Sequence, residues 1–173
     1  RSRKADASEQ EKICQQLALQ IQTEPDPLVR QAIQQTIADF QSPLASAVLL
    51  AGLDDDHREV RLTCCRKLGE RGSPDAIDKL RLVVTQDEDV DVRLAAVDAL
   101  GQIGTPAAVL AIDAALDDRD PAMQYAGVEA MRLASGQDLG PDVVAWRQYA
   151  ASLRPSGSDP ASIASQPEAT ATR

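Results

Sequence analysis

The chain has 173 residues, of which 43% are hydrophobic but only 2% aromatic, and it carries a formal net charge of −9. This length is enough to bury one substantial core, and an apolar content dominated by alanine and leucine favours closely packed helices over sheets. The negative charge excludes the basic surface that nucleic-acid binding needs. We therefore expect a protein or peptide partner, basic or neutral, with no nucleic acid and no membrane insertion.

A short pattern recurs along the chain. Val-Arg pairs stand at Val29-Arg30, Val60-Arg61 and Val92-Arg93, at intervals of 31 and 32, and a degenerate copy follows at Met123-Gln124. Paired helices repeating at such a period predict a solenoid, because one helical hairpin cannot bury its apolar face alone.

Two further columns support the period. The third residue after each pair's first member is small, and the eighth is large and apolar: Ala32, Thr63, Ala95 and Ala126, then Ile37, Leu68, Leu100 and Met131. Each of the first three copies ends in a Ser-Pro or Thr-Pro step, at Ser42-Pro43, Ser73-Pro74 and Thr105-Pro106. Such a step is typical of an N-cap followed by proline at the first helical position.

These signals predict that each repeat consists of a first helix followed by a second helix. The expected ranges are 9–22, 27–40, 43–53, 57–71, 74–85, 89–102, 106–116 and 121–134. Gly69, Gly72, Gly101 and Gly104 are expected to close the second helices of the middle repeats. After them, Pro141, Trp146 and Tyr149 indicate a last helix at 141–153 that covers the exposed end of the stack.

The expected fold is all-α: a right-handed α-solenoid of about four helical hairpins with a C-terminal capping helix. We divide the chain into a flexible N-terminus at 1–7, repeats at 8–135, a capping segment at 136–154 and a disordered tail at 155–173, which is rich in Ser, Pro, Ala and Thr. No apolar run is long enough to span a bilayer and no signal peptide is present. Since the residues begin at Arg1, both a cytoplasmic and an exported location stay open.

The Asp-x5-Arg spacing, the small-residue helix and the "LGxxG" segment together resemble HEAT repeats, most closely the short bacterial subtype called PBS-lyase HEAT-like. The resemblance covers residues 8–135. In that family an acid six residues before the arginine commonly bonds across neighbouring repeats. The resemblance therefore implies a ladder of Asp55, Arg61, Asp87 and Arg93, with Glu24 and Arg30 a weaker match and Gln124 replacing the last arginine.

Catalytic motifs are absent from the sequence. The single histidine, His57, has no nucleophile announced beside it. The catalytic HEAT-like proteins, the deoxyhypusine hydroxylases, bind two irons through several His-Glu pairs, and this chain has no His-Glu step. The alternation Asp87, Asp89, Asp91 suits a helix N-terminus better than a calcium loop. We therefore predict that the chain is not an enzyme and has no catalytic residue, metal or cofactor.

One face of the second helices is more apolar than expected. Counting from each Val or Met, the second residue falls about 200° around the helix and the fifth about 140°, away from the first helix. These positions hold Gln31, Leu62, Leu94 and Tyr125, and Gln34, Cys65, Val97 and Val128. The stripe predicts a binding surface, with packing against neighbouring helices as the alternative. The expected partner-binding residues are Leu62, Leu94, Val97, Tyr125 and Val128, with Arg61, Arg93 and Arg132.

The leading functional hypothesis is therefore a scaffold or adaptor that binds a protein or peptide on this face. The alternative, implied by the family resemblance, is an accessory subunit of an enzyme such as a bilin (phycobilisome) lyase-like protein, for which Cys65 would be the reactive residue. A third reading is a structural module inside a larger exported assembly. Three cysteines do not make a disulfide framework, and we expect reduced thiols.

Overall fold

The computed structural model describes residues 7–154, which form nine α-helices, two short 3-10 helices and no strand. The predicted flexible N-terminus and disordered tail lie outside these residues, except Ala7, where the first helix begins. The elements are α1 (Ala7–Gln20), α2 (Pro27–Ile37), α3 (Pro43–Ala51), η1 (Gly52–Asp54), α4 (Arg58–Glu70), η2 (Pro74–Ala76), α5 (Ile77–Gln86), α6 (Val90–Ile103), α7 (Pro106–Leu116), α8 (Pro121–Ser135) and α9 (Val143–Ser152).

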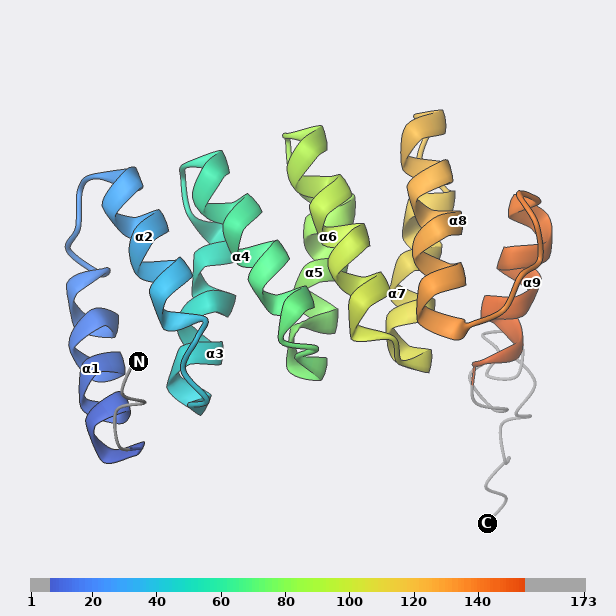
Figure 1. Cartoon of the computed structure of the whole chain (residues 1–173). Coiled ribbons are helices and arrows are strands. Elements are labelled where there is room, and N and C mark those ends of the chain that lie inside the picture. The colour runs from blue at the N-terminus through green and yellow to red at the C-terminus, as the bar shows by residue number, and fades with distance from the viewer. Residues whose placement is uncertain (1–6, 155–173) are drawn as a thin grey trace, which may run out of the picture.

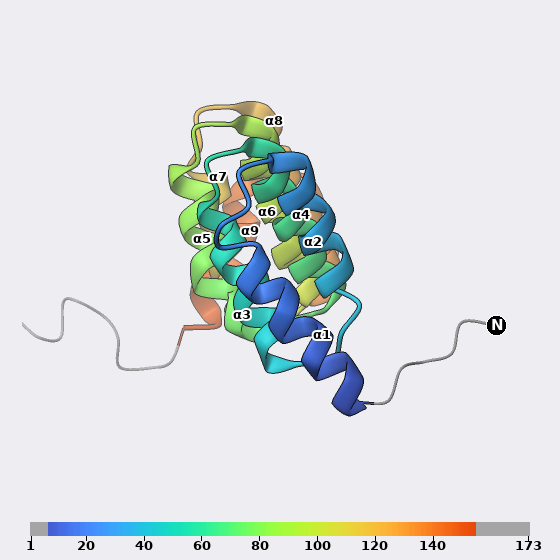
Figure 2. The same cartoon turned by 90° about the vertical axis from the view of Figure 1, so that its left-hand side faces the viewer.

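The helices form two layers (Figure 1). α2, α4, α6 and α8 lie side by side in one row, and Figure 2 shows α3, α5 and α7 in a second row behind them. Each helix of the first row packs against the next, α2 on α4, α4 on α6 and α6 on α8. This arrangement confirms the predicted all-α solenoid.

Side-chain caps explain where most helices begin. The hydroxyl of Ser42 accepts a hydrogen bond from the N–H of Leu44, and the hydroxyl of Thr105 accepts one from the N–H of Ala108. Each of these two capping residues directly precedes a proline. Ser73 differs, because its side chain makes no capping bond and Pro74–Ala76 form a 3-10 turn before α5. The Ser/Thr-Pro step thus marks the start of a helical segment in the three repeats that follow the first.

The expectation for the glycines needs a correction at two positions. Gly72 and Gly104 follow α4 and α6 with φ of +60° and +66°, as a helix end requires. Gly69 and Gly101 instead lie inside these helices, on the flank that meets the next repeat. A Cβ on Gly69 would stand 2.7 Å from the Cα of Ala99, so glycine here allows two neighbouring helices to approach closely.

α9 covers the end of the row that contains α7, against which it mainly packs. Its Trp146 is fully buried, and the indole N–H donates to the carbonyl oxygen of Gly140 at 2.8 Å. The ring of Tyr149 meets that of Trp146 edge to face at 6.0 Å. α9 also contacts α8, but Tyr125 and Leu133 of α8 stay exposed, so among the described residues α8 keeps one open flank.

A ladder of arginines and aspartates joins consecutive repeats. The guanidinium of Arg61 donates twice to the carboxylate of Asp87 in the next repeat, at 2.7 and 3.0 Å, and also to the backbone carbonyl of Asp55 in its own, at 2.9 Å. Arg30 pairs in the same way with Asp55, at 2.7 Å. Arg93 approaches Asp118 only to 3.8 Å, so the ladder loosens toward the C-terminus.

Two groups of the ladder are held in their charged form. Burial alone would raise the pKa of Asp55, but hydrogen bonds from Arg30 and from the N–H of His57 outweigh it and the pKa is lowered. The hydrogen bond to Asp87 raises the pKa of Arg61. At neutral pH Asp55 and Arg61 are therefore both charged.

The three cysteines are free and belong to the core. Burial raises the pKa of Cys14, takes that of Cys64 well above its ordinary value and raises that of Cys65 to about 12. All three are therefore protonated thiols at physiological pH, and they act as small apolar side chains.

Replacing Arg61 with alanine is expected to lower the free energy of unfolding by about 3 kcal/mol, because the carboxylate of Asp87 stays buried without its partner. Urea denaturation followed by circular dichroism measures the loss. The control is Arg58→Ala, which breaks a largely exposed pair with Asp91 and should cost less than about 1 kcal/mol. Equal, small losses in both variants would contradict a structural ladder.

The native protein at pH 8 should leave all three thiols unreacted with Ellman's reagent over minutes. A thiol of pKa about 12, such as Cys65, has only ~10⁻⁴ of its population as thiolate at that pH. In concentrated urea all three should react quickly. A thiol that reacts at once in the folded protein would show that it lies at the surface.

Candidate functional site

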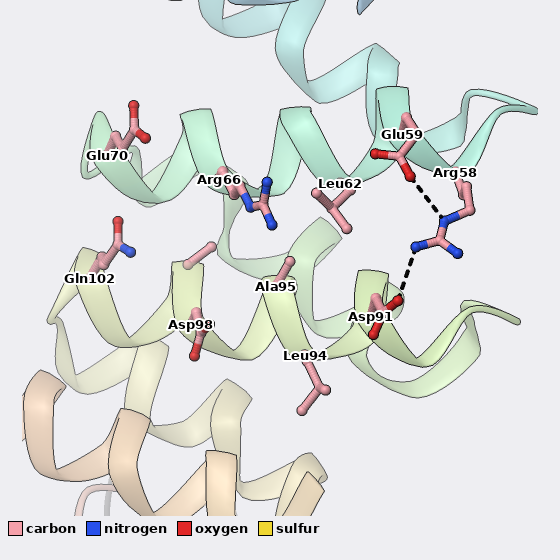
Figure 3. A pocket seen from close by; sticks show the side chains of 11 residues that line it. Arg58, Glu59, Leu62, Arg66, Glu70, Asp91, Leu94, Ala95, Asp98 and Gln102 are labelled. Carbon is pink, nitrogen blue, oxygen red and sulfur yellow. Dashed lines mark hydrogen bonds and ion pairs between the residues drawn. The ribbon is translucent and has the colours of Figure 1, made fainter. Parts of the chain in front are cut away.

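A groove of about 570 Å³ runs between α4 and α6 on the outer side of their row (Figure 3). It is lined by Arg58, Glu59, Leu62, Arg66, Glu70, Asp91, Leu94, Ala95, Asp98, Ala99 and Gln102. Small residues on the α6 side, with Leu62 on the α4 side, make an apolar floor. Charged and polar side chains stand at both ends and in the middle.

One end of the groove is closed by ion pairs. Arg58 of α4 reaches Asp91 of α6 at 2.9 Å and Asp89 at 3.3 Å, and it also lies 3.3 Å from Glu59. Figure 3 shows this bridge from one wall to the other, with Glu70 and Gln102 at the opposite end. The bridge fixes the width of the groove at one end, while the far end carries no cross-link of its own.

Arg66 and Asp98 carry the charges in the middle of the groove. Among the described residues, neither the guanidinium of Arg66 nor the carboxylate of Asp98 makes a hydrogen bond or ion pair, although both side chains are exposed. Partial burial raises the pKa of Asp98, and the nearby charge of Arg66 opposes that shift. A partner could therefore use both groups without breaking any contact of the protein.

The apolar column expected to bind a partner is exposed to different degrees. Leu62 is 6% exposed and forms part of the groove floor. Leu94 is partly buried and lines the same groove, and its side chain leans away from α4 in Figure 3. Tyr125 is 67% exposed on the open flank of α8. The structure brings Leu62 and Leu94 together and leaves Tyr125 apart.

The second expected column is not a surface. Val97 and Val128 are buried, as are Gln34 and Cys65 at the equivalent positions. Gly69 is nine residues after Val60, which places it about 180° around α4 from that valine, and it faces Ala99 of the next repeat. A residue at 140° is therefore enclosed between the first helix and the neighbouring repeat, and the prediction of Val97 and Val128 as partner-binding residues is wrong.

The three arginines predicted beside this surface have structural partners. Arg61 is buried in the ladder with Asp87, and Arg93 donates to the carbonyl of Asp87 at 3.2 Å. Arg132 pairs with Glu129 at 3.0 Å and with Asp138 at 3.4 Å. Arg61 is thus withdrawn from the predicted site, and binding through the other two would compete with these contacts.

The groove also contains residues that the sequence analysis missed. Arg66 and Glu70 follow Leu62 at steps of four residues, and Asp98 and Gln102 follow Leu94 in the same way. Residues four apart share a helix face. Extending each leucine along its own face would have found them.

Neither a metal site nor a membrane span is visible among residues 7–154. These residues hold no group of three or more metal-ligating side chains, and none of their helices is long and apolar enough to cross a membrane. The aspartates that resemble a calcium loop have other roles: Asp87 belongs to the ladder, and Asp89 caps α6 by accepting the N–H groups of Asp91 and Val92.

A solved structure, that of human deoxyhypusine hydroxylase in complex with glycerol, resembles this fold with a TM-score of 0.66 and 22% sequence identity. The match covers 72% of this chain and 44% of that one, so this chain spans less than half of the enzyme's length. At this identity the likeness shows the fold alone. It nevertheless overturns the prediction that the chain is not an enzyme, because the same architecture belongs to an enzyme.

Among curated proteins, none matches the sequence closely. A family model of HEAT repeats matches residues 14–90 and 81–145, which together span more than half of the chain. The match does not distinguish the PBS-lyase-like subtype. It agrees with the repeat period and with the stacked hairpins, and the chain belongs to the HEAT-repeat family.

Proposed function

We propose that this HEAT-repeat protein is a scaffold that binds a protein or peptide segment in the groove between α4 and α6. The observation that carries the proposal is the pair of unengaged charges, Arg66 and Asp98, beside an apolar floor. Specific protein-binding surfaces combine such an apolar centre with charged groups that fix the register of the partner.

The charge of the groove favours a basic partner. Its lining has four carboxylates, at Glu59, Glu70, Asp91 and Asp98, against two guanidinium groups. Arg58 pairs with Glu59 and Asp91, and Lys67 pairs with Glu70 at 2.8 Å. Asp98 is therefore the lining carboxylate that has no ion pair among the described residues, and a lysine or arginine of the partner placed there would relieve its partial burial.

The bilin-lyase alternative draws no support from the position of Cys65. This thiol is fully buried and its pKa is raised to about 12, whereas a nucleophilic cysteine needs access and a lowered pKa.

A display library of random twelve-residue peptides is selected for binding to the full chain, and the selected peptides should bind in this groove. Asp98→Lys and Arg66→Glu are each expected to weaken a selected peptide roughly tenfold, or about 1.4 kcal/mol, because each reverses a charge that faces the peptide. Fluorescence polarisation with the labelled peptide measures the affinity, and circular dichroism checks that both variants fold.

The matched control is Arg81→Glu, an exposed charge reversal on α5 in the other row, which should leave the affinity unchanged. Failure to select any peptide would contradict the proposal. So would a peptide whose affinity changes as much in the control as in Arg66→Glu, since both variants change the net charge equally and the peptide would be responding to net charge alone.

A further inference from the structure

The open flank of α8 carries two large apolar side chains in contact with solvent. Tyr125 is 67% exposed and Leu133 is 64% exposed. They are eight residues apart, which is about two helical turns. α8 is the last helix of the row formed by α2, α4, α6 and α8 (Figure 1), so among the described residues no further hairpin covers this flank.

Leu133 is a departure from the chain's own repeat. Ten residues after the first member of each repeated pair, α4 has Glu70 and α6 has Gln102, and both are exposed polar side chains. α8 has a leucine at this position. Packing inside the chain does not require it, because most of its side chain meets solvent. An exposed apolar group of this kind is typical of a surface that contacts a partner.

The same flank does not suit another hairpin stacked in the regular way. Where α4 and α6 meet the next helix they have Gly69 and Gly101, and a Cβ on Gly69 would stand 2.7 Å from the Cα of Ala99. The equivalent residue of α8 is Arg132. A helix that approached α8 as α6 approaches α4 would collide with the arginine side chain. A second copy that extended the row head to tail is therefore disfavoured.

The flank is instead symmetric about Glu129, as an antiparallel pair of identical helices requires. Tyr125 and Leu133 lie four residues before and after Glu129, and the small, exposed Ala122 and Gly136 lie seven residues before and after it. In a two-fold dimer the same patch meets itself, so that each contact occurs twice. Tyr125 would pack on Leu133 of the second copy, and the small residues would let the two helices approach at both ends.

The charge at the centre of the flank is already paired. Two bare carboxylates of Glu129 would repel each other at the axis. The guanidinium of Arg132 in the same chain donates to both oxygens of this carboxylate, at 3.0 and 3.2 Å. Each copy would therefore bring an ion pair to the axis rather than a lone charge. The net charge of −9 on each chain still opposes association, and salt would screen that repulsion.

We propose that the open flank of α8 is a dimer interface, in which two copies of this chain pack α8 against α8 in antiparallel orientation about a two-fold axis at Glu129. A single pair of helices makes a small interface, so we expect a weak dimer with a Kd on the order of tens of micromolar. This surface is separate from the groove between α4 and α6 and does not depend on it.

Sedimentation equilibrium of the full chain tests the dimer. Association should be reversible and should strengthen with added salt. Leu133→Glu should weaken it by at least about tenfold, because the residue enters the contact twice. The control is Leu19→Glu on α1, where the leucine is 68% exposed and the change in charge is the same. A chain that stays monomeric near millimolar concentration would overturn the proposal, as would equal losses in the two variants.

Cross-linking tests the orientation. Glu129→Cys would place one reactive thiol of each copy beside the axis, because the three native thiols are buried. A bismaleimide with a short spacer should therefore join the two copies covalently. Asp98→Cys, at the same repeat position on the exposed side of α6, should stay monomeric under the same conditions. If the chain dimerises but the two variants cross-link to the same extent, the contact uses another face or a parallel arrangement, and the proposal is wrong.

Discussion

Each hairpin of this protein buries its apolar surface against the next hairpin, and the rest of the structure depends on that contact. α4 and α6 are each enclosed by the first helix of their own hairpin and by a neighbouring second helix on either side. Only a narrow strip is left for solvent. Gly69 of α4 faces Ala99 of the next hairpin, so its direction around the helix is buried. Asp98 of α6 lies only about 60° further around its helix and is already exposed. Any partner of this face must therefore be recognised by few residues on each helix.

The arginine–aspartate ladder gives this packing its register. Apolar contacts between small residues tolerate sliding, because alanine and glycine present nearly flat surfaces. The bidentate bond between Arg61 and Asp87 does not, since its two N–H groups fit the carboxylate in one position. The additional bond from Arg61 to the carbonyl of Asp55 ties the same side chain to its own repeat. Each rung thus fixes the distance between neighbouring second helices, and with it the width of the groove between α4 and α6.

The fold could be predicted from the sequence because the repeat multiplies every weak signal. A single Ser-Pro step or a single small residue indicates little, but the same column read in three or four copies predicts a helix start or a helix contact. The candidate site could not be predicted in the same way. Val97 and Leu94 are three residues apart and both apolar, and only the position of the neighbouring helix decides that one is enclosed and the other lines a groove. Arg66 and Asp98 occupy the same position of consecutive repeats, six residues after Val60 and Val92, but with opposite charges, and their lack of partners is visible only in three dimensions.

Departures from the repeat are therefore more informative about function than the repeat itself. Positions that recur in the middle copies, such as Val60 and Val92, are fully buried, so packing explains them and they need no further role. Where the first repeat puts Gln34 in an apolar column, packing is made worse, because a buried acceptor is left without a donor. Gly52 removes the clash that this glutamine would otherwise cause but does not satisfy its oxygen. The same glycine also makes room for the thiol of Cys64, because a Cβ at position 52 would lie 2.4 Å from its Sγ. Packing therefore accounts for Gly52 and leaves at this place only the free oxygen of Gln34 without a partner among the described residues.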